Sequence, residues 1–175
     1  MDLVDDVVAL IDTRSFSSLW YWIAVAVLWS SASHFVLGIP FDMVTRARRR
    51  GAEALADLEA LAHLQVRRRL QVMRTGGAWV VGVTSAVLSA VFVLGFLYGV
   101  ELLQALFLLL FPLSMVNLMA LRAAARIEAE HAVGDQLIRR LSRLRFWIQL
   151  LGMMSVFVTA LWGMWRLMSI SVLGG

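Results

Sequence analysis

Residues 75–121 read TGGAWVVGVTSAVLSAVFVLGFLYGVELLQALFLLLFPLSMVNLMAL, and Glu101 is their only charged side chain. One bilayer crossing needs about 20 consecutive apolar residues. The stretch is long enough for two crossings, and Gly99, two residues before Glu101, favours a tight turn between them. We therefore predict a transmembrane helical hairpin whose limbs are residues 77–98 and 102–121.

Two further apolar segments flank this hairpin. Residues 19–37 and residues 146–165 contain no permanently charged side chain. Aromatic residues open the first segment at Trp20 and close the second at Trp165, as membrane–water interfaces favour. Hydrophobic residues make up 61% of the 175 residues, more than a soluble domain of this size can bury. Each segment predicts one more span, which gives four in all.

The two connecting segments, residues 41–74 and 122–145, are polar and amphipathic, with apolar side chains three or four positions apart, as in surface helices. They hold 14 of the 16 arginines, so the positive-inside rule predicts that both are cytoplasmic and that the N and C termini are outside. Nucleic acid is not an expected partner, because these arginines border apolar spans and do not alternate with aromatic side chains. We expect anionic lipid headgroups to bind Arg46, Arg48, Arg49, Arg50, Arg67, Arg68, Arg69, Arg74, Arg139, Arg140, Arg143 and Arg145.

The two ends of the chain complete the predicted fold. Residues 1–14 place apolar side chains at helical spacing among aspartates, which predicts a short amphipathic surface helix. Their acidic character differs from the basic start of a cleaved signal peptide, so we expect the first span to be retained. Residues 166–175 are expected to form a short outer tail. The prediction is a single all-α membrane domain over residues 1–175, with four spanning helices and amphipathic cytoplasmic connections.

Polar side chains within the predicted spans are candidates for interhelical contacts. Gln104, Ser114 and Asn117 lie in one limb of the hairpin, and polar groups in lipid seek partners on neighbouring helices. The alternative is that these three side chains line a path for an ion or solute at the bend that Pro112 predicts. Near the outer ends of the spans, Glu101 and Arg166 are expected to form an ion pair, which we consider structural.

Two histidines are candidates for metal binding, because each has a glutamate on its own predicted helix. Glu59 precedes His63 by four residues, and Glu128 precedes His131 by three, the spacing found in carboxylate-bridged di-metal sites. Pairing of these acids with bases on the facing cytoplasmic helix explains the same residues without a metal. The chain has no cysteine and no motif for nucleophilic, phosphate-loop or zinc chemistry, so we expect neither a catalytic residue nor a cofactor.

Three segments resemble a family of small bacterial inner-membrane proteins that carry the label "component of SufBCD complex". They are DTRSFSSLWYW at residues 12–22, SHFVLGIPFDMV at residues 33–44 and YGVELLQALF at residues 98–107. The resemblance implies a place in the bacterial inner membrane and a link with iron–sulfur cluster assembly. It carries no catalytic residue over to this chain.

These observations predict a non-catalytic accessory, scaffold or assembly subunit that binds anionic lipid. Its expected partner is another membrane or cytoplasmic protein, or a second copy of the chain. Residues 52–70 together with residues 121–138 form the predicted partner surface. The alternative is a subunit of a small oligomeric channel or transporter.

Overall fold

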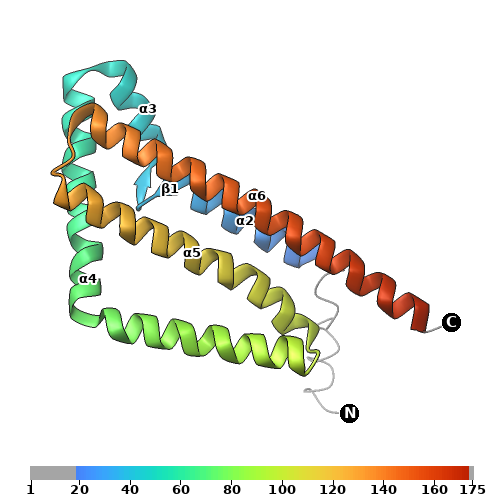
Figure 1. The fold of residues 1–175 in the computed structure, drawn as a ribbon. Coiled ribbons are helices and arrows are strands. Elements are labelled where there is room, and N and C mark those ends of the chain that lie inside the picture. Colours follow the sequence, from blue (N-terminus) through green and yellow to red (C-terminus); the bar gives the residue numbers. More distant parts are fainter. Residues whose placement is uncertain (1–18, 174–175) are drawn as a thin grey trace, which may run out of the picture.

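The computed structural model describes residues 19–173, so the surface helix predicted at residues 1–14 lies outside the described part. The described chain is almost wholly helical, which confirms the all-α class. In chain order its elements are α2 (Leu19–His34), β1 (Phe35–Val36), β2 (Ile39–Pro40), α3 (Phe41–Arg50), α4 (Ala52–Phe92), the π-helical η2 (Val93–Leu97), α5 (Glu101–Ala129) and α6 (Gly134–Leu173), as Figure 1 shows.

Within the described residues, three helical stretches are long and apolar enough to cross a membrane: Ala52–Leu97, Glu101–Ala129 and Gly134–Arg166. Only 11%, 17% and 28% of their most apolar windows are buried inside the protein, so most of this apolar surface needs another covering. A membrane-embedded, multi-pass protein fits these properties. The fourth predicted span corresponds to α2, whose 16 residues extend only about 24 Å, short of the ~30 Å hydrocarbon core.

A two-stranded hairpin follows α2 and ends that helix three residues earlier than the sequence predicted. Phe35 pairs with Pro40 and Val36 with Ile39 across the hairpin. Leu37 and Gly38, at its tip, both have positive φ angles, 58° and 81°, which is the geometry of a type I′ turn. Because Val36 and Ile39 are fully buried, the hairpin is anchored in the protein core.

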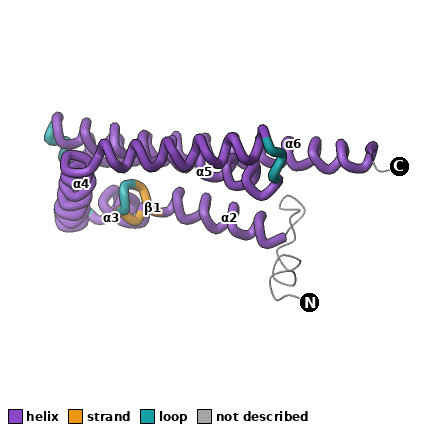
Figure 2. The backbone as a smooth tube through the Cα atoms, turned by 90° about the horizontal axis from the view of Figure 1, so that it is seen from below, coloured by secondary structure: helices purple, strands orange, loops and turns teal. Residues whose placement is uncertain are grey.

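The predicted segment 41–74 is divided at Gly51, where φ is 84° and ψ is −156°, a conformation that glycine adopts without strain. Beyond it, α4 continues without a break into the first limb of the hairpin and bends sharply midway, as Figure 1 shows. In Figure 2 its first part is seen end-on, whereas α2, α5 and α6 run across the view. Gly76 and Gly77 lie near the middle of α4, and adjacent glycines are a common site of helix kinks.

The other two long helices also join segments that the sequence analysis treated separately. One is α5, which begins at Glu101 after a turn at Gly99 (φ 75°) and runs through the second limb into the basic segment. The other is α6, which runs from the second arginine cluster through the fourth apolar segment to Leu173, so most of the predicted outer tail is helical.

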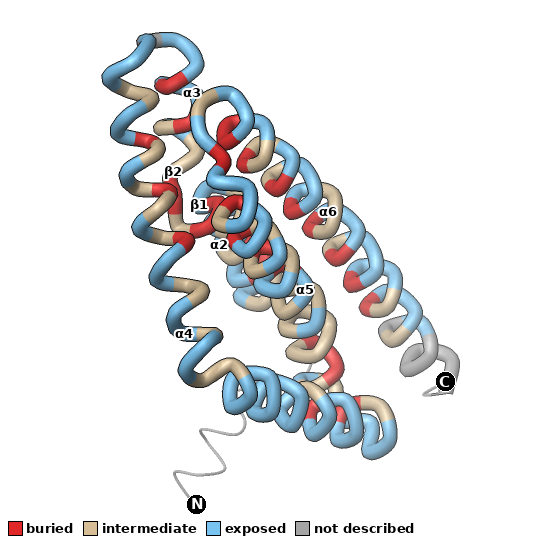
Figure 3. Tube along the Cα trace, turned by 60° about the vertical axis from the view of Figure 1, so that its left-hand side comes forward, coloured by how far each residue is buried: buried red, intermediate tan, exposed pale blue. Residues whose placement is uncertain are grey.

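The densest part of the core lies at the arginine-rich end of the helices. Leu58, Ala62 and Val66 form one buried stripe on the first part of α4, and Ile127 of α5 and Leu141 of α6 are fully buried against the same cluster. Figure 3 shows the contrast with the second part of α4, which is exposed along nearly its whole length. The basic end is therefore a packed unit, and the apolar limbs extend from it.

Candidate functional site

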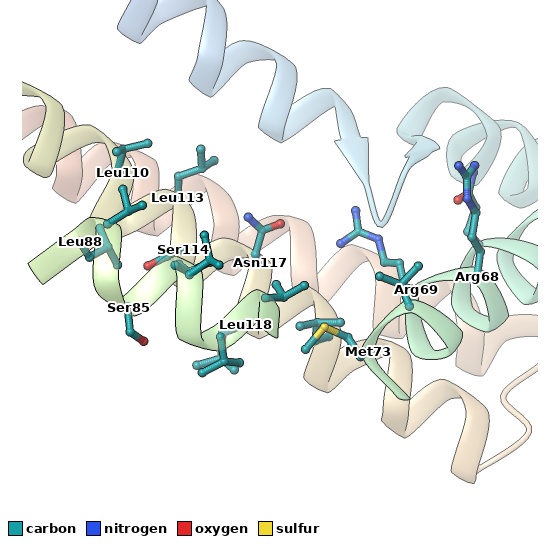
Figure 4. A pocket seen from close by; sticks show the side chains of 18 residues that line it. Arg68, Arg69, Met73, Ser85, Leu88, Leu110, Leu113, Ser114, Asn117 and Leu118 are labelled. Atoms are coloured by element: carbon teal, nitrogen blue, oxygen red, sulfur yellow. The ribbon is translucent and has the colours of Figure 1, made fainter. Parts of the chain in front are cut away.

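A cavity of about 870 Å³ lies between the second part of α4 and the facing side of α5. Its walls are mostly valine and leucine side chains, among them Val80 and Leu88 of α4 and Leu113 and Leu118 of α5, as Figure 4 shows in part. Volumes of this order are typical of small-molecule sites. Residues from both parts of α4 line the cavity, and its inner end is the end lined by the first part of that helix.

Polar residues line the inner end and one side of this cavity. Arg68 and Arg69 come from the first part of α4 and lie at the end of the cavity opposite Leu88. Asn117 of α5 lies between Leu88 and these two arginines (Figure 4). Ser114 also lines the cavity, but its hydroxyl donates to the carbonyl of Phe111 on its own helix at 2.6 Å. Asn117 makes no hydrogen bond within residues 19–173.

Arg69 is half-buried, and loss of water contact lowers the pKa of its guanidinium. Neither Arg68 nor Arg69 forms a hydrogen bond or an ion pair with any residue in the described part of the chain. A partly desolvated cation without a carboxylate partner favours an external anion, because burial weakens competition from water. The inner end of the cavity is therefore suited to a negatively charged group.

Other arginines predicted to bind headgroups have partners inside the protein. Arg74 of α4 pairs with Glu128 of α5 at 2.6 Å, and Arg48 of α3 donates to the hydroxyl of Ser142 in α6 at 2.9 Å. These contacts connect the two basic segments to each other. The remaining internal contacts are Arg46 with Asp42 (3.3 Å), Arg140 with Glu130, and Arg145 over the ring of Phe41 (3.9 Å).

The two glutamates among the candidate metal residues make contacts inside the protein. Glu59 accepts a hydrogen bond from the backbone N–H of Gly134, the first residue of α6, at 2.6 Å. Glu128 binds Arg74, and His131 is exposed in the turn before α6 with a positive φ of 45°. Within residues 19–173 no group of three or more His, Cys, Asp or Glu side chains is arranged to hold a metal ion.

Gln104 of α5 contacts two neighbouring helical elements, η2 and α6. Its amide is buried, donates from Nε2 to the carbonyl of Gly95 at 2.9 Å, and accepts from the indole N–H of Trp162 at 3.1 Å. The sequence did not reveal either partner. Gly95 permits this approach, since a Cβ there would lie 2.9 Å from the backbone nitrogen of Gln104.

Two further contacts join the spans. Arg166 donates to the carbonyl of Gly99 at 3.3 Å, which brings it to the turn that precedes Glu101. Ser155 of α6 donates to the carbonyl of Leu108 at 3.4 Å. That carbonyl is the one left without its helical partner because Pro112, four residues later, has no N–H.

Comparisons of the chain with protein-family models, with curated proteins and with solved structures found no match. The resemblance described above therefore stays a prediction.

Proposed function

We propose that this protein is a non-catalytic accessory, scaffold or assembly subunit of a bacterial inner membrane. In this proposal four helices cross the bilayer, both termini are outside, and the arginine-rich end lies in the cytoplasm. There it binds anionic lipid and a protein partner. The observation that carries the proposal is the packed basic end, from which weakly packed apolar helices extend.

The contacts between the two basic segments support a common side for both. Arg48 reaches Ser142, Arg74 reaches Glu128, and Glu59 reaches the start of α6. Segments joined in this way belong to the same membrane face. Since they hold most of the arginines, the positive-inside rule then favours the cytoplasmic face.

The position of the first part of α4 supports an interfacial role. This part lies across the ends of the other long helices (Figures 1 and 2), so it runs along the membrane surface if those helices cross the bilayer. Its buried stripe faces the core, whereas Leu64 is 65% exposed. On the neighbouring turn Val133 is 52% exposed. Exposed apolar side chains on a polar segment favour protein contact, which supports residues 52–70 and 121–138 as the partner surface.

A fourth span at α2 is supported by its packing against α6. The ring of Trp29 rests on Gly152 so closely that a Cβ on the glycine would lie 2.8 Å from it. Tyr21 donates to the carbonyl of Ala105 at 3.2 Å near the other end of α2. The helix therefore lies alongside the other apolar helices.

Purification in a mild detergent, followed by mass spectrometry of the retained proteins, tests the proposal. We expect a stoichiometric protein partner that Leu64→Gln removes. Leu97→Gln is the matched control, because Leu97 is 71% exposed but lies at the opposite end of the protein. Retention of no partner by the unaltered chain, or equal loss in both variants, contradicts the proposal. Proteins of iron–sulfur cluster assembly are the first to examine, given the resemblance of residues 12–22, 33–44 and 98–107.

The alternative, a channel or transporter subunit, is favoured by Asn117, which lines the cavity without a hydrogen-bond partner in residues 19–173. Gln104 does not support it, because its amide is occupied by Gly95 and Trp162. Flux measurements in liposomes separate the two functions. Conduction by the purified chain that Asn117→Leu changes favours the channel, and absence of flux favours the accessory subunit.

A further inference from the structure

We propose that the cavity between α4 and α5 binds one anionic phospholipid, with its phosphate on Arg68 and Arg69 and an acyl chain along the apolar walls. This inference rests on the proposed membrane embedding of the chain and assigns one specific site to the general preference for anionic lipid.

The charges around the cavity define the headgroup. Arg68 and Arg69 are the only charged residues among those that line it, and neither has a carboxylate partner in the described part of the chain. The planar guanidinium group matches the geometry of a phosphate and donates to it in pairs. A zwitterionic headgroup adds a positive charge beside these two cations. The site therefore selects a phospholipid with net negative charge.

The depth of the cavity defines the rest of the ligand. From the arginines the lining continues along the apolar limbs through Leu118, Leu113 and Leu88, so the cavity is polar where a lipid headgroup would lie and apolar where its acyl chain would lie. The amide of Asn117 lies between the two regions and is free to donate to an ester carbonyl. Free phosphate or another small anion leaves the apolar part of the cavity empty.

A helix from a second copy of this chain is a less suitable occupant. Residues 19–37 and 146–165 contain no acidic side chain, and Glu101 is the only one in residues 75–121. Glu101 lies at the turn between α4 and α5, at the opposite end of the spans from Arg68 and Arg69. No apolar segment of a second copy with the same orientation therefore offers a carboxylate at the depth of these arginines.

Native mass spectrometry of the full chain in detergent micelles tests the site directly. The probes are phosphatidylglycerol, phosphatidylcholine and inorganic phosphate. We expect a one-to-one adduct with phosphatidylglycerol. The double variant Arg68→Gln/Arg69→Gln should lower the affinity for this lipid about 25-fold, because each basic residue at a membrane surface contributes about fivefold. Arg67→Gln is the matched control: Arg67 is exposed on the same helix but does not line the cavity, so we expect less than a twofold change.

A second pair of variants tests the cavity itself. Ser85 lines it from α4, so Ser85→Phe should fill the acyl region and remove the adduct with both arginines intact. Ser89, one turn further along, does not line it, and Ser89→Phe should leave binding unchanged. Equal binding of phosphatidylcholine, equal binding of inorganic phosphate, or equal effects of the paired variants overturns the proposal. These readouts need no protein partner, so loss of the scaffold function and loss of the lipid site give different results.

Discussion

Trp162 of α6 donates its indole N–H to the Oε1 atom of Gln104 in α5 at 3.1 Å, and the other end of the same amide donates to Gly95. One buried side chain thus connects η2, α5 and α6. Phe96 lies against the same indole ring, with its ring centre 5.3 Å away. The three elements are therefore held together by one polar group inside an aromatic cluster.

Gln104→Leu is predicted to destabilise the protein, because the indole N–H of Trp162 and the carbonyl of Gly95 both lose a partner. Interhelical hydrogen bonds of this kind contribute about 0.6 to 2 kcal/mol each, so we expect a loss of about 1 to 3 kcal/mol. Unfolding in mixed micelles measures the change. Gln149→Leu is the control, because Gln149 is exposed on α6, and an equal loss there would refute the assignment.

Gly95→Ala should also destabilise the protein, for a steric reason. The added Cβ would lie 2.9 Å from the backbone nitrogen of Gln104, and backbone does not move aside as a flexible side chain does. Overpacking of this kind costs about 1 to 3 kcal/mol. The matched change Gly82→Ala meets nothing within 4 Å and should stabilise the helix by about 0.5 to 1 kcal/mol. Effects of the same sign at both sites would argue against the close approach.

The sequence was sufficient for the parts of the fold that depend on local apolar runs. Residues 75–121 predicted two limbs and a turn, and α5 begins at Glu101 as that turn requires. The sequence did not predict that α4 continues through Arg74 into the first limb, because apolar residues have the same spacing in a straight helix and in a kinked one. The hairpin at Phe35–Pro40 was missed because its strands have two residues each and are stabilised by burial of Val36 and Ile39.

The site was harder to predict, because it depends on which side chains lack partners. All the arginines of residues 41–74 have the same chemistry in the sequence. Only the packing of the helices distinguishes Arg74, which binds Glu128, from Arg69, which lines the cavity. Similarly, the sequence offered both Gln104 and Asn117 as polar residues for interhelical contacts, and the fold gives Gln104 two partners and leaves Asn117 exposed.

Ser155→Ala is predicted to lower the free energy of unfolding by less than about 1 kcal/mol. The change removes only the hydrogen bond to the carbonyl of Leu108, and that contact is long, at 3.4 Å. The effect should depend on Pro112. In Pro112→Ala the backbone N–H of residue 112 can bind that carbonyl, so the serine becomes dispensable. A double-mutant cycle measured by unfolding in micelles checks this, and additive effects of the two changes would contradict it.

Glu59→Ala should destabilise the start of α6, because the carboxylate accepts the N–H of Gly134 and lies at the positive end of the helix dipole. Loss of such a contact costs about 0.5 to 2 kcal/mol. Asp57→Ala, on an exposed position of the same helix, is the control and should have little effect. If Glu59 instead belonged to a metal site, added Mn²⁺ or Zn²⁺ would raise the melting temperature of the unaltered chain and not of the variant. We expect no such shift.

Single cysteines test the orientation of the chain, because the natural sequence contains none and each introduced thiol is the only one. Val100→Cys lies in the turn between α4 and α5, and Glu53→Cys lies in the exposed first turn of α4. An impermeant maleimide should label position 100 in intact cells and position 53 only after permeabilisation.

A tag fused before Met1 then decides whether α2 crosses the membrane. An odd number of crossings separates the N-terminus from position 53 if α2 spans, so the tag should be accessible from the same side as position 100. A tag accessible only from the cell interior would mean that α2 lies in the membrane without crossing it, as its short length would then explain.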